Sequence, residues 1–310
     1  MLSIPYKVEK TITIYRSLAE VFTAVSDFST WARWSPWLCL DPDCTVSIDK
    51  PKGTVGHRQA WEGKLIGSGE MRISSLKTEK SIDYDLQFIK PWKSRSLTSF
   101  QFSPDGEGVR VEWRMQGKIL FFMRKMMSAL IGSDFERGLA MLKEYIETGN
   151  VSSELSDKGV AQRPLRYYVG IERTCSMAEV GPAMKADFNT LEKLFESSTL
   201  PEPQEVVSIY KKFDMVRDVC VYISGFLYDS LPKTPDGTVS GCLPDHQALK
   251  INHKGSYQHL GNAWSAAMSR LRARYKANKA VPMYEIYLNH PDKVAERDLL
   301  TDVYAPVKSS

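Results

Sequence analysis

The sequence lacks the long apolar runs that mark membrane proteins and exported proteins. No stretch holds the roughly 20 consecutive apolar residues that a helix needs to cross a bilayer. The opening residues, MLSIPYKVEK, have no apolar run behind a basic tip, so we predict no signal peptide. These absences predict a cytoplasmic protein with no membrane partner.

Cysteine and histidine are both scarce. The five cysteines, at 39, 44, 175, 220 and 242, form no CxxC pair and are too sparse for a secreted disulfide framework. The five histidines form no HxH or HxxxH pair with the spacing of a zinc site. We therefore expect reduced thiols and no metal.

Motifs for common cofactors are also missing. The chain has no GxGxxG, GxxxxGK[ST] or GxSxG sequence, which argues against nucleotide binding and serine-hydrolase chemistry. No helix-turn-helix is recognisable, and a net charge of +4 over 310 residues is too small to indicate nucleic-acid binding. We expect no cofactor and no direct contact with nucleic acid.

The most informative stretch is VPMYEIYLNHP, residues 281–291, which alternates like a β-strand but has a carboxylate at its centre. With a period of two, Met283, Glu285 and Tyr287 share one face, and the opposite face is apolar. A carboxylate in such a strand is costly unless a donor, a cation or water meets it. The face of Glu285 is therefore either exposed to solvent or the wall of a ligand pocket.

The pattern around this strand occurs twice, as strand, helix, strand and strand. When SIY at 208–210 is aligned with EIY at 285–287, Ser208 takes the place of Glu285. We therefore predict a duplicated α+β domain with a cleft between its halves, in which only the second half supplies an acid. The helix and the two strands after it are expected at 179–195, 205–214 and 217–226 in the first copy, and at 253–271, 281–291 and 297–307 in the second.

These segments resemble the GyrI-like small-molecule-binding domain, also found as the effector-binding domain of AraC-type and MerR-type regulators. The resemblance is carried by HKGSY from His253, by the helix with Trp264, by PxYEIYLxHP and by the closing TDVYAPV. It implies a central aromatic cleft in which the glutamate matching Glu285 pairs with cationic, lipophilic ligands. The predicted ligand-binding residues are Glu285, Tyr287, Met283, Tyr257, Trp264 and Tyr210.

The first half of the chain has another pattern. A strand at 6–15 leads into a short helix whose start has Ser17 and Glu20 spaced as a capping box. Strands separated by turns follow from 45 to 115, with Asp105-Gly106 as a hairpin turn, and a long helix is expected over 120–146, kinked near Gly132.

This order, with the segment DFSTWARWSPW, resembles the START-like superfamily, also called SRPBCC or polyketide-cyclase-like. The resemblance implies a helix-grip fold with an apolar cavity between the curved sheet and the long helix. Ordinary core packing remains the alternative for every candidate wall residue. The candidates are Trp61, Met71, Phe88, Trp113, Met115, Met123, Met127 and Leu130.

The sequence therefore predicts an α+β protein of two domains, over residues 1–149 and 165–310. The polar segment 150–164 between them has no periodicity and is predicted to be a linker.

Three functions fit these patterns. The first is a cytoplasmic sensor that binds a lipophilic or cationic small molecule, with Glu285 among aromatic side chains as the recognition element. The second, implied by the GyrI-like resemblance, is a hydrolase of strained, cyclopropane-type compounds with Glu285 as acid or base. The third is an interaction module that lends its cavity to a separate regulator, an unknown protein partner.

Overall fold

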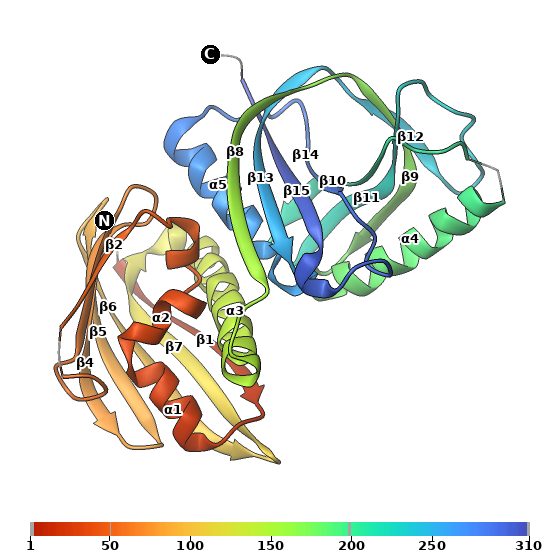
Figure 1. Cartoon of the computed structure of the whole chain (residues 1–310). Helices are drawn as coiled ribbons and strands as arrows, with labels where there is room; N and C mark the ends of the chain where they lie inside the picture. Colours follow the sequence, from red (N-terminus) through yellow and green to blue (C-terminus); the bar gives the residue numbers. More distant parts are fainter. Residues whose placement is uncertain (1–2, 50, 198–199, 309–310) are drawn as a thin grey trace. The chain divides into compact units, whose positions relative to one another are not determined.

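The computed structural model describes residues 3–49, 51–197 and 200–308. The chain divides into two compact units, with the boundary between Ser152 and Ser153. Each unit has its own antiparallel sheet and its own helices, as Figure 1 shows.

In the described part of the first unit, seven strands form one sheet in the order β1-β7-β6-β5-β4-β3-β2. Three helices accompany it: α1 (Leu18–Ser26), α2 (Phe28–Trp34) and α3 (Arg124–Thr148), with 3-10 turns η1 (Leu38–Leu40) and η2 (Phe121–Met123). The strands are β1 (Ser3–Ile14), β2 (Thr45–Asp49), β3 (Arg58–Gly63), β4 (Gly67–Lys77), β5 (Ser81–Lys90), β6 (Ser94–Asp105) and β7 (Gly108–Leu120).

Local sequence signals account for several of these boundaries. The predicted capping box starts α1, where the Ser17 backbone N–H donates to the Glu20 carboxylate over 3.0 Å. The predicted hairpin joins β6 to β7 with Gly106 at a φ of 58°, which glycine adopts without strain. Helix α3 ends at Thr148 and is capped by Gly149, which has a φ of 87°.

Helix α3 packs against β1 and β7 and against α2, so the curved sheet wraps around it (Figure 1). The contact is built on large aromatic rings: Phe135 of α3 stacks on Trp113 of β7 with 4.1 Å between ring centroids. Trp31 and Trp34 of α2 complete this cluster, and both are fully buried. The helix-grip arrangement expected for this half of the chain is confirmed.

In the described part of the second unit, eight strands form a sheet in the order β12-β9-β11-β10-β14-β15-β13-β8. The helices are α4 (Val180–Glu196) and α5 (Gly261–Arg274), with 3-10 turns η3 (Met177–Glu179), η4 (Tyr257–His259) and η5 (Glu296–Asp298). The strands are β8 (Ser153–Arg163), β9 (Arg166–Cys175), β10 (Glu205–Asp214), β11 (Val219–Tyr228), β12 (Val239–Leu243), β13 (His246–Gly255), β14 (Met283–Tyr287) and β15 (Leu300–Val307).

This strand order is symmetric about its centre, which confirms the predicted duplication. β10 and β14 are the matching strands of the two copies, and they pair with each other in the middle of the sheet. Ser208 lies directly opposite Glu285 in this register. The two residues that the sequence alignment placed in equivalent positions therefore face each other across the pseudo-twofold axis.

The predicted linker was wrong for most of its length. Residues 153–163 form β8, which pairs with β13 at the edge of the second sheet. At its end Arg163 binds Glu205 over 2.5 Å, and its guanidinium lies 4.7 Å from the centroid of the Tyr304 ring. This polar stretch is thus an integral strand of the second unit.

The predicted helix at 253–271 was wrong at its start. His253 still belongs to β13, where it pairs with Thr301 of β15, and α5 begins only at Gly261. The strand continues because the sheet offers β13 hydrogen-bonding partners on both sides, β15 and β8.

None of the helices within the described ranges has the length and apolar character needed to cross a membrane.

The second sheet must curl strongly. β8 lies at one edge and β9 next to the other edge, yet only Pro164 and Leu165 connect them. One face of the sheet carries an apolar core that includes Val207, Ile209 and Tyr284. The other face carries α4 and α5, and Glu285 lies on this helix-covered side.

Candidate functional site

The candidate site lies on the helix-covered face of β10 and β14. Strand β14 alternates as the sequence predicts: Tyr284 and Ile286 belong to the apolar core on one face, and Glu285 and Tyr287 point to the other. Glu285 is only 1% exposed, so its face is buried in the domain and is not an outer surface.

Three neutral groups from separate elements meet the Glu285 carboxylate. The indole N–H of Trp264 on α5 donates to Oε1, and the Tyr287 hydroxyl donates to Oε2 over 2.7 Å. The Tyr210 hydroxyl on β10 is a further hydrogen-bonding partner. Tyr210 and Tyr287 are the matching tyrosines of SIY and EIY, so both copies of the repeat contribute a phenol to one carboxylate.

Burial raises the pKa of Glu285 above its usual value, and the hydrogen bonds from Tyr287, Trp264 and Tyr210 act in the opposite direction. Within the described ranges, no lysine, arginine or histidine forms an ion pair with Glu285. The carboxylate is therefore desolvated and hydrogen-bonded, but it has no countercharge.

A second buried carboxylate shows the contrast. Asp187 of α4 accepts two hydrogen bonds from Arg173 Nε, at 2.9 and 3.0 Å, and one from the Tyr222 hydroxyl at 3.1 Å. Its charge is thus matched by a guanidinium in the same half of the domain. Glu285 alone of these two carboxylates is left with neutral donors.

Aromatic rings surround the acid. The Tyr210 and Trp264 rings meet edge to face with centroids 4.8 Å apart, and Tyr257 approaches Tyr287 in the same manner at 5.7 Å. Tyr257 is 37% exposed, so this part of the aromatic cluster reaches the protein surface. Met283 lies opposite Tyr210 in the strand register. The structure therefore brings the predicted ligand-binding residues together.

Three further side chains from the first repeat lie beside Tyr287; the sequence analysis singled out Ser208 only as the counterpart of Glu285, and it missed Met184 and Phe188. Met184 Sδ lies 3.2 Å from the Tyr287 hydroxyl, Ser208 Oγ lies 3.0 Å from it, and the Phe188 ring lies 5.6 Å from the Tyr287 ring. A usable signal existed in the repeat. Met184 follows Ser176 by eight residues, as Trp264 follows Ser256, so Met184 occupies the place of Trp264 in the first copy.

The candidate cavity residues of the first unit fall into a group that is buried in the packed core and a group that is only half-buried. Trp113 and Met115 are 1% and 3% exposed, and Trp113 contacts the rings of Trp37, Phe100 and others, so both belong to the packed core. The remaining candidates include a Trp61–Phe88 pair with ring centroids 6.1 Å apart. Of the rest, Met71 is buried in the core, while Met123, Met127 and Leu130 are half-buried on η2 and α3.

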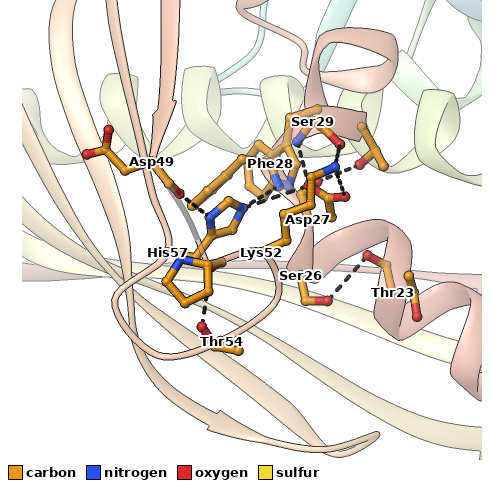
Figure 2. Close-up of polar contacts among 12 residues, drawn as sticks. Thr23, Ser26, Asp27, Phe28, Ser29, Asp49, Lys52, Thr54 and His57 are labelled. Carbon is orange, nitrogen blue, oxygen red and sulfur yellow. Dashed lines mark hydrogen bonds and ion pairs between the residues drawn. The ribbon is translucent and has the colours of Figure 1, made fainter.

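The buried His57 of the first unit belongs to a structural cluster, shown in Figure 2. Its Nε2 accepts a hydrogen bond from the Phe28 backbone N–H at the start of α2, over 3.2 Å. Nδ1 therefore carries the proton and donates to the Asp49 carbonyl oxygen over 2.7 Å. Lys52 binds Asp27 beside it over 3.1 Å. Both ring nitrogens are thus engaged in joining β2 to α2.

Other reactive groups are dispersed. All five cysteines are free thiols. Among the residues whose placement is described, no three His, Cys, Asp or Glu side chains gather in a way that could hold a metal ion.

Two family models match the chain, one for each unit. Residues 5–147 match the model described as polyketide cyclase/dehydrase and lipid transport, and residues 160–308 match the model described as GyrI-like small-molecule-binding domain. Both predicted resemblances are therefore confirmed, in the predicted order.

Solved structures with similarity to the chain are distant from it. A Chromobacterium violaceum protein is 16% identical, with 46% of this chain and 96% of that protein covered and a TM-score of 0.36. The Aha1 dimer from Colwellia psychrerythraea is 18% identical, with 46% and 98% covered and a TM-score of 0.35. EcmrR in its DNA complex is 13% identical, with 60% and 69% covered and a TM-score of 0.43.

Proposed function

We propose that this chain, which joins a polyketide-cyclase-like domain to a GyrI-like small-molecule-binding domain, is a cytoplasmic sensor that binds a lipophilic organic cation in the cleft around Glu285. The observation that carries the proposal is the buried Glu285 carboxylate, which only neutral donors meet. A bound cation would supply the countercharge that the protein does not provide.

The surroundings of Glu285 favour an organic cation over a simple ion. Trp264, Tyr257 and Tyr210 offer aromatic faces and edges, and a cation over such a face is attracted by the ring quadrupole. Calcium and magnesium ions prefer several oxygen ligands, whereas the surroundings of Glu285 offer one carboxylate among phenols, an indole and a thioether. A ligand with an ammonium-like centre and apolar substituents matches both features.

A pair of ligands with the same shape tests the charge directly. Benzyltrimethylammonium and neopentylbenzene differ mainly in a positively charged nitrogen that replaces a carbon. The full chain should bind the cation more tightly, and Glu285→Gln should weaken cation binding by about 1 to 3 kcal/mol while leaving the neutral ligand nearly unaffected. Calorimetry or quenching of tryptophan fluorescence measures both affinities. Equal cation binding by the parent and the Gln variant would refute the proposal.

The pH dependence of binding gives an independent check. Because burial raises the pKa of Glu285, protons compete with the cation for the carboxylate. Cation affinity should rise with pH up to that pKa and then level off, while the affinity for the neutral ligand should not follow this curve.

A hydrolase is the second candidate. It is favoured by the same raised pKa of Glu285 together with the Tyr287 hydroxyl at 2.7 Å, a pair that could exchange a proton with a substrate. Incubation with strained, cyclopropane-bearing compounds followed by mass spectrometry separates the two functions. A sensor returns the ligand unchanged, whereas an enzyme converts it in proportion to time, and Glu285→Gln should stop that conversion.

A further inference from the structure

A second surface of interest lies at one end of the first domain, far along the sequence from the cleft. There the turn between β5 and β6 lies beside the end of β7 and the start of α3. The register shows this, because Ser96 of β6 pairs with Gly117 of β7, and the chain continues from both towards the same end of the sheet. We define the docking end as residues 89–97 and 116–128.

Large apolar side chains at the docking end are exposed. Trp92 is 66% exposed, Phe121 and Phe122 are 58% and 60% exposed, and Met126 is 50% exposed. Leu97 on β6 adds another at 52%. Single exposed apolar residues are ordinary, but several aromatic and aliphatic side chains at one end of a domain mark an interaction site.

The charge of the docking end has one sign. Its two segments contain the basic residues Lys90, Lys93, Arg95, Lys118, Arg124 and Lys125 and no Asp or Glu, against a net charge of +4 for the whole chain. Lys90 pairs with Glu62, but the other five form no ion pair within the described parts of the chain. Cations of this kind are available to an anionic partner.

The same basic residues border a depression. Arg95, Lys118, Arg124 and Lys125 line an open groove of about 1400 Å³ together with Lys7 and Arg72. Only two acids, Glu70 and Asp85, line the groove. The basic residues that line it outnumber them, so the groove has an excess of positive charge.

We propose that the docking end binds the surface of an anionic lipid bilayer. Trp92, Phe121 and Phe122 would enter the headgroup region, where amphipathic and aromatic side chains partition favourably. The surrounding lysines and arginines would meet lipid phosphates, and each such contact strengthens binding to an anionic surface. This placement requires no membrane-spanning segment, but it departs from the sequence prediction of no membrane partner, which rested only on the lack of long apolar runs.

The chemistry of the docking end favours a bilayer over other partners. A second copy of this chain bound face to face would bring two sets of unpaired cations together, which is unfavourable. Single-stranded nucleic acid could use the aromatic rings and the cations, but it offers nothing to Met126 and Leu97, whose aliphatic surface matches acyl chains. An anionic lipid surface uses both the charge and all of the apolar side chains.

Vesicle co-sedimentation of the full chain tests the proposal. Vesicles of phosphatidylcholine with about 30% phosphatidylglycerol should bind at least roughly tenfold more tightly than pure phosphatidylcholine vesicles, and about 0.5 M salt should weaken this binding. Equal binding to both vesicle types, or no binding to either, would overturn it. So would tight binding of a single-stranded oligonucleotide, or self-association, in the absence of vesicle binding.

Two double variants locate the contact. Phe121→Ser with Phe122→Ser, and Arg124→Glu with Lys125→Glu, should each weaken binding to the anionic vesicles about tenfold. The matched controls lie in the second domain: Phe195→Ser with Phe213→Ser for exposed aromatic rings, and Lys158→Glu with Lys185→Glu for charge reversal. These controls should bind like the parent. If they lose binding equally, the interaction is a property of overall charge and the docking end is refuted; circular dichroism confirms that each variant is folded.

Discussion

At the scale of single residues, the chain uses two buried carboxylates in different ways. Asp187 has a guanidinium from Arg173 and a hydroxyl from Tyr222, and such a matched set holds α4 on its strands. Glu285 has an indole and two phenols, which lower its cost of burial without neutralising it. The cation in the proposed function would supply the countercharge that this carboxylate lacks.

The free energy of unfolding should reflect the cost of burying the Glu285 carboxylate. The folded-state pKa of Glu285 is raised above 4.5, so its favourable contribution exists below pH 4.5 and is lost as the pH rises through the folded-state value. Glu285→Gln should therefore be more stable than the parent at pH 7, by about 1.4 kcal/mol for each unit of elevation, and nearly equal to it near pH 4. Chemical denaturation at the two pH values measures the difference.

Asp187→Asn is the matched control for that experiment. It removes the charged acceptor of Arg173 and Tyr222, so it should lower stability at pH 7, by roughly 2 kcal/mol. If both variants changed stability in the same direction, the distinction between a charge-paired and an unpaired carboxylate would be wrong.

At the scale of elements, β8 and β13 form an interface held partly by neutral histidine. His253 of β13 is fully buried, and its Nε2 lies 3.1 Å from Ser153 Oγ at the start of β8. Asn262 of α5 donates to the same hydroxyl over 3.0 Å. Burial, together with the nearby His259, lowers the pKa of His253 from 6.5 to about 4.

The lowered pKa predicts a loss of stability in acid. His253 contributes stability that is present above pH 6.5 and is lost as the pH falls through 4, by up to about 3 kcal/mol. His253→Gln keeps a hydrogen-bonding group and should flatten the dependence between these limits. Stability should be measured in a protein that also carries Glu285→Gln. The reason is that Glu285 makes stability fall as the pH rises, whereas His253 makes it increase. An unchanged slope would exclude His253 as its source.

β8 itself should be required for the second domain. A fragment of residues 165–310 lacks β8, which leaves one edge of β13 without hydrogen-bonding partners and removes the Arg163–Glu205 ion pair. At about 0.5 to 1.5 kcal/mol for each hydrogen bond, it should be less stable than a fragment of residues 153–310 by roughly 3 kcal/mol or more. Urea denaturation of both fragments gives the difference, and equal midpoints would show that β8 is dispensable.

At the scale of the whole molecule, each unit closes its own sheet over its own core. We predict that fragments 1–152 and 153–310 fold independently, each with a cooperative thermal transition. Glu285→Gln in the full chain should shift only the transition that fragment 153–310 shows alone. Failure of both fragments to unfold cooperatively would contradict the two-domain description.

The sequence by itself determined the features that depend on local periodicity. The alternation of residues 281–291 placed Glu285 and Tyr284 on opposite faces, because side-chain direction in a strand follows from its period of two. The SIY and EIY repeat gave Ser208 and Glu285 equivalent positions, and Ser17 with Glu20 marked a helix start. Short-range signals of this kind depend on backbone geometry that each segment carries with it.

Only the tertiary structure decided what depends on distant neighbours. β8 is polar because it is an edge strand, and a register shift interrupts its pairing between Leu249 and Ile251 of β13, so its own alternation does not reveal it. The raised pKa of Glu285 likewise depends on its burial by other elements of the domain, and the hydrogen bonds from Trp264 and Tyr210 only partly offset that burial. Desolvation is a property of everything packed around a group, and no local pattern encodes it.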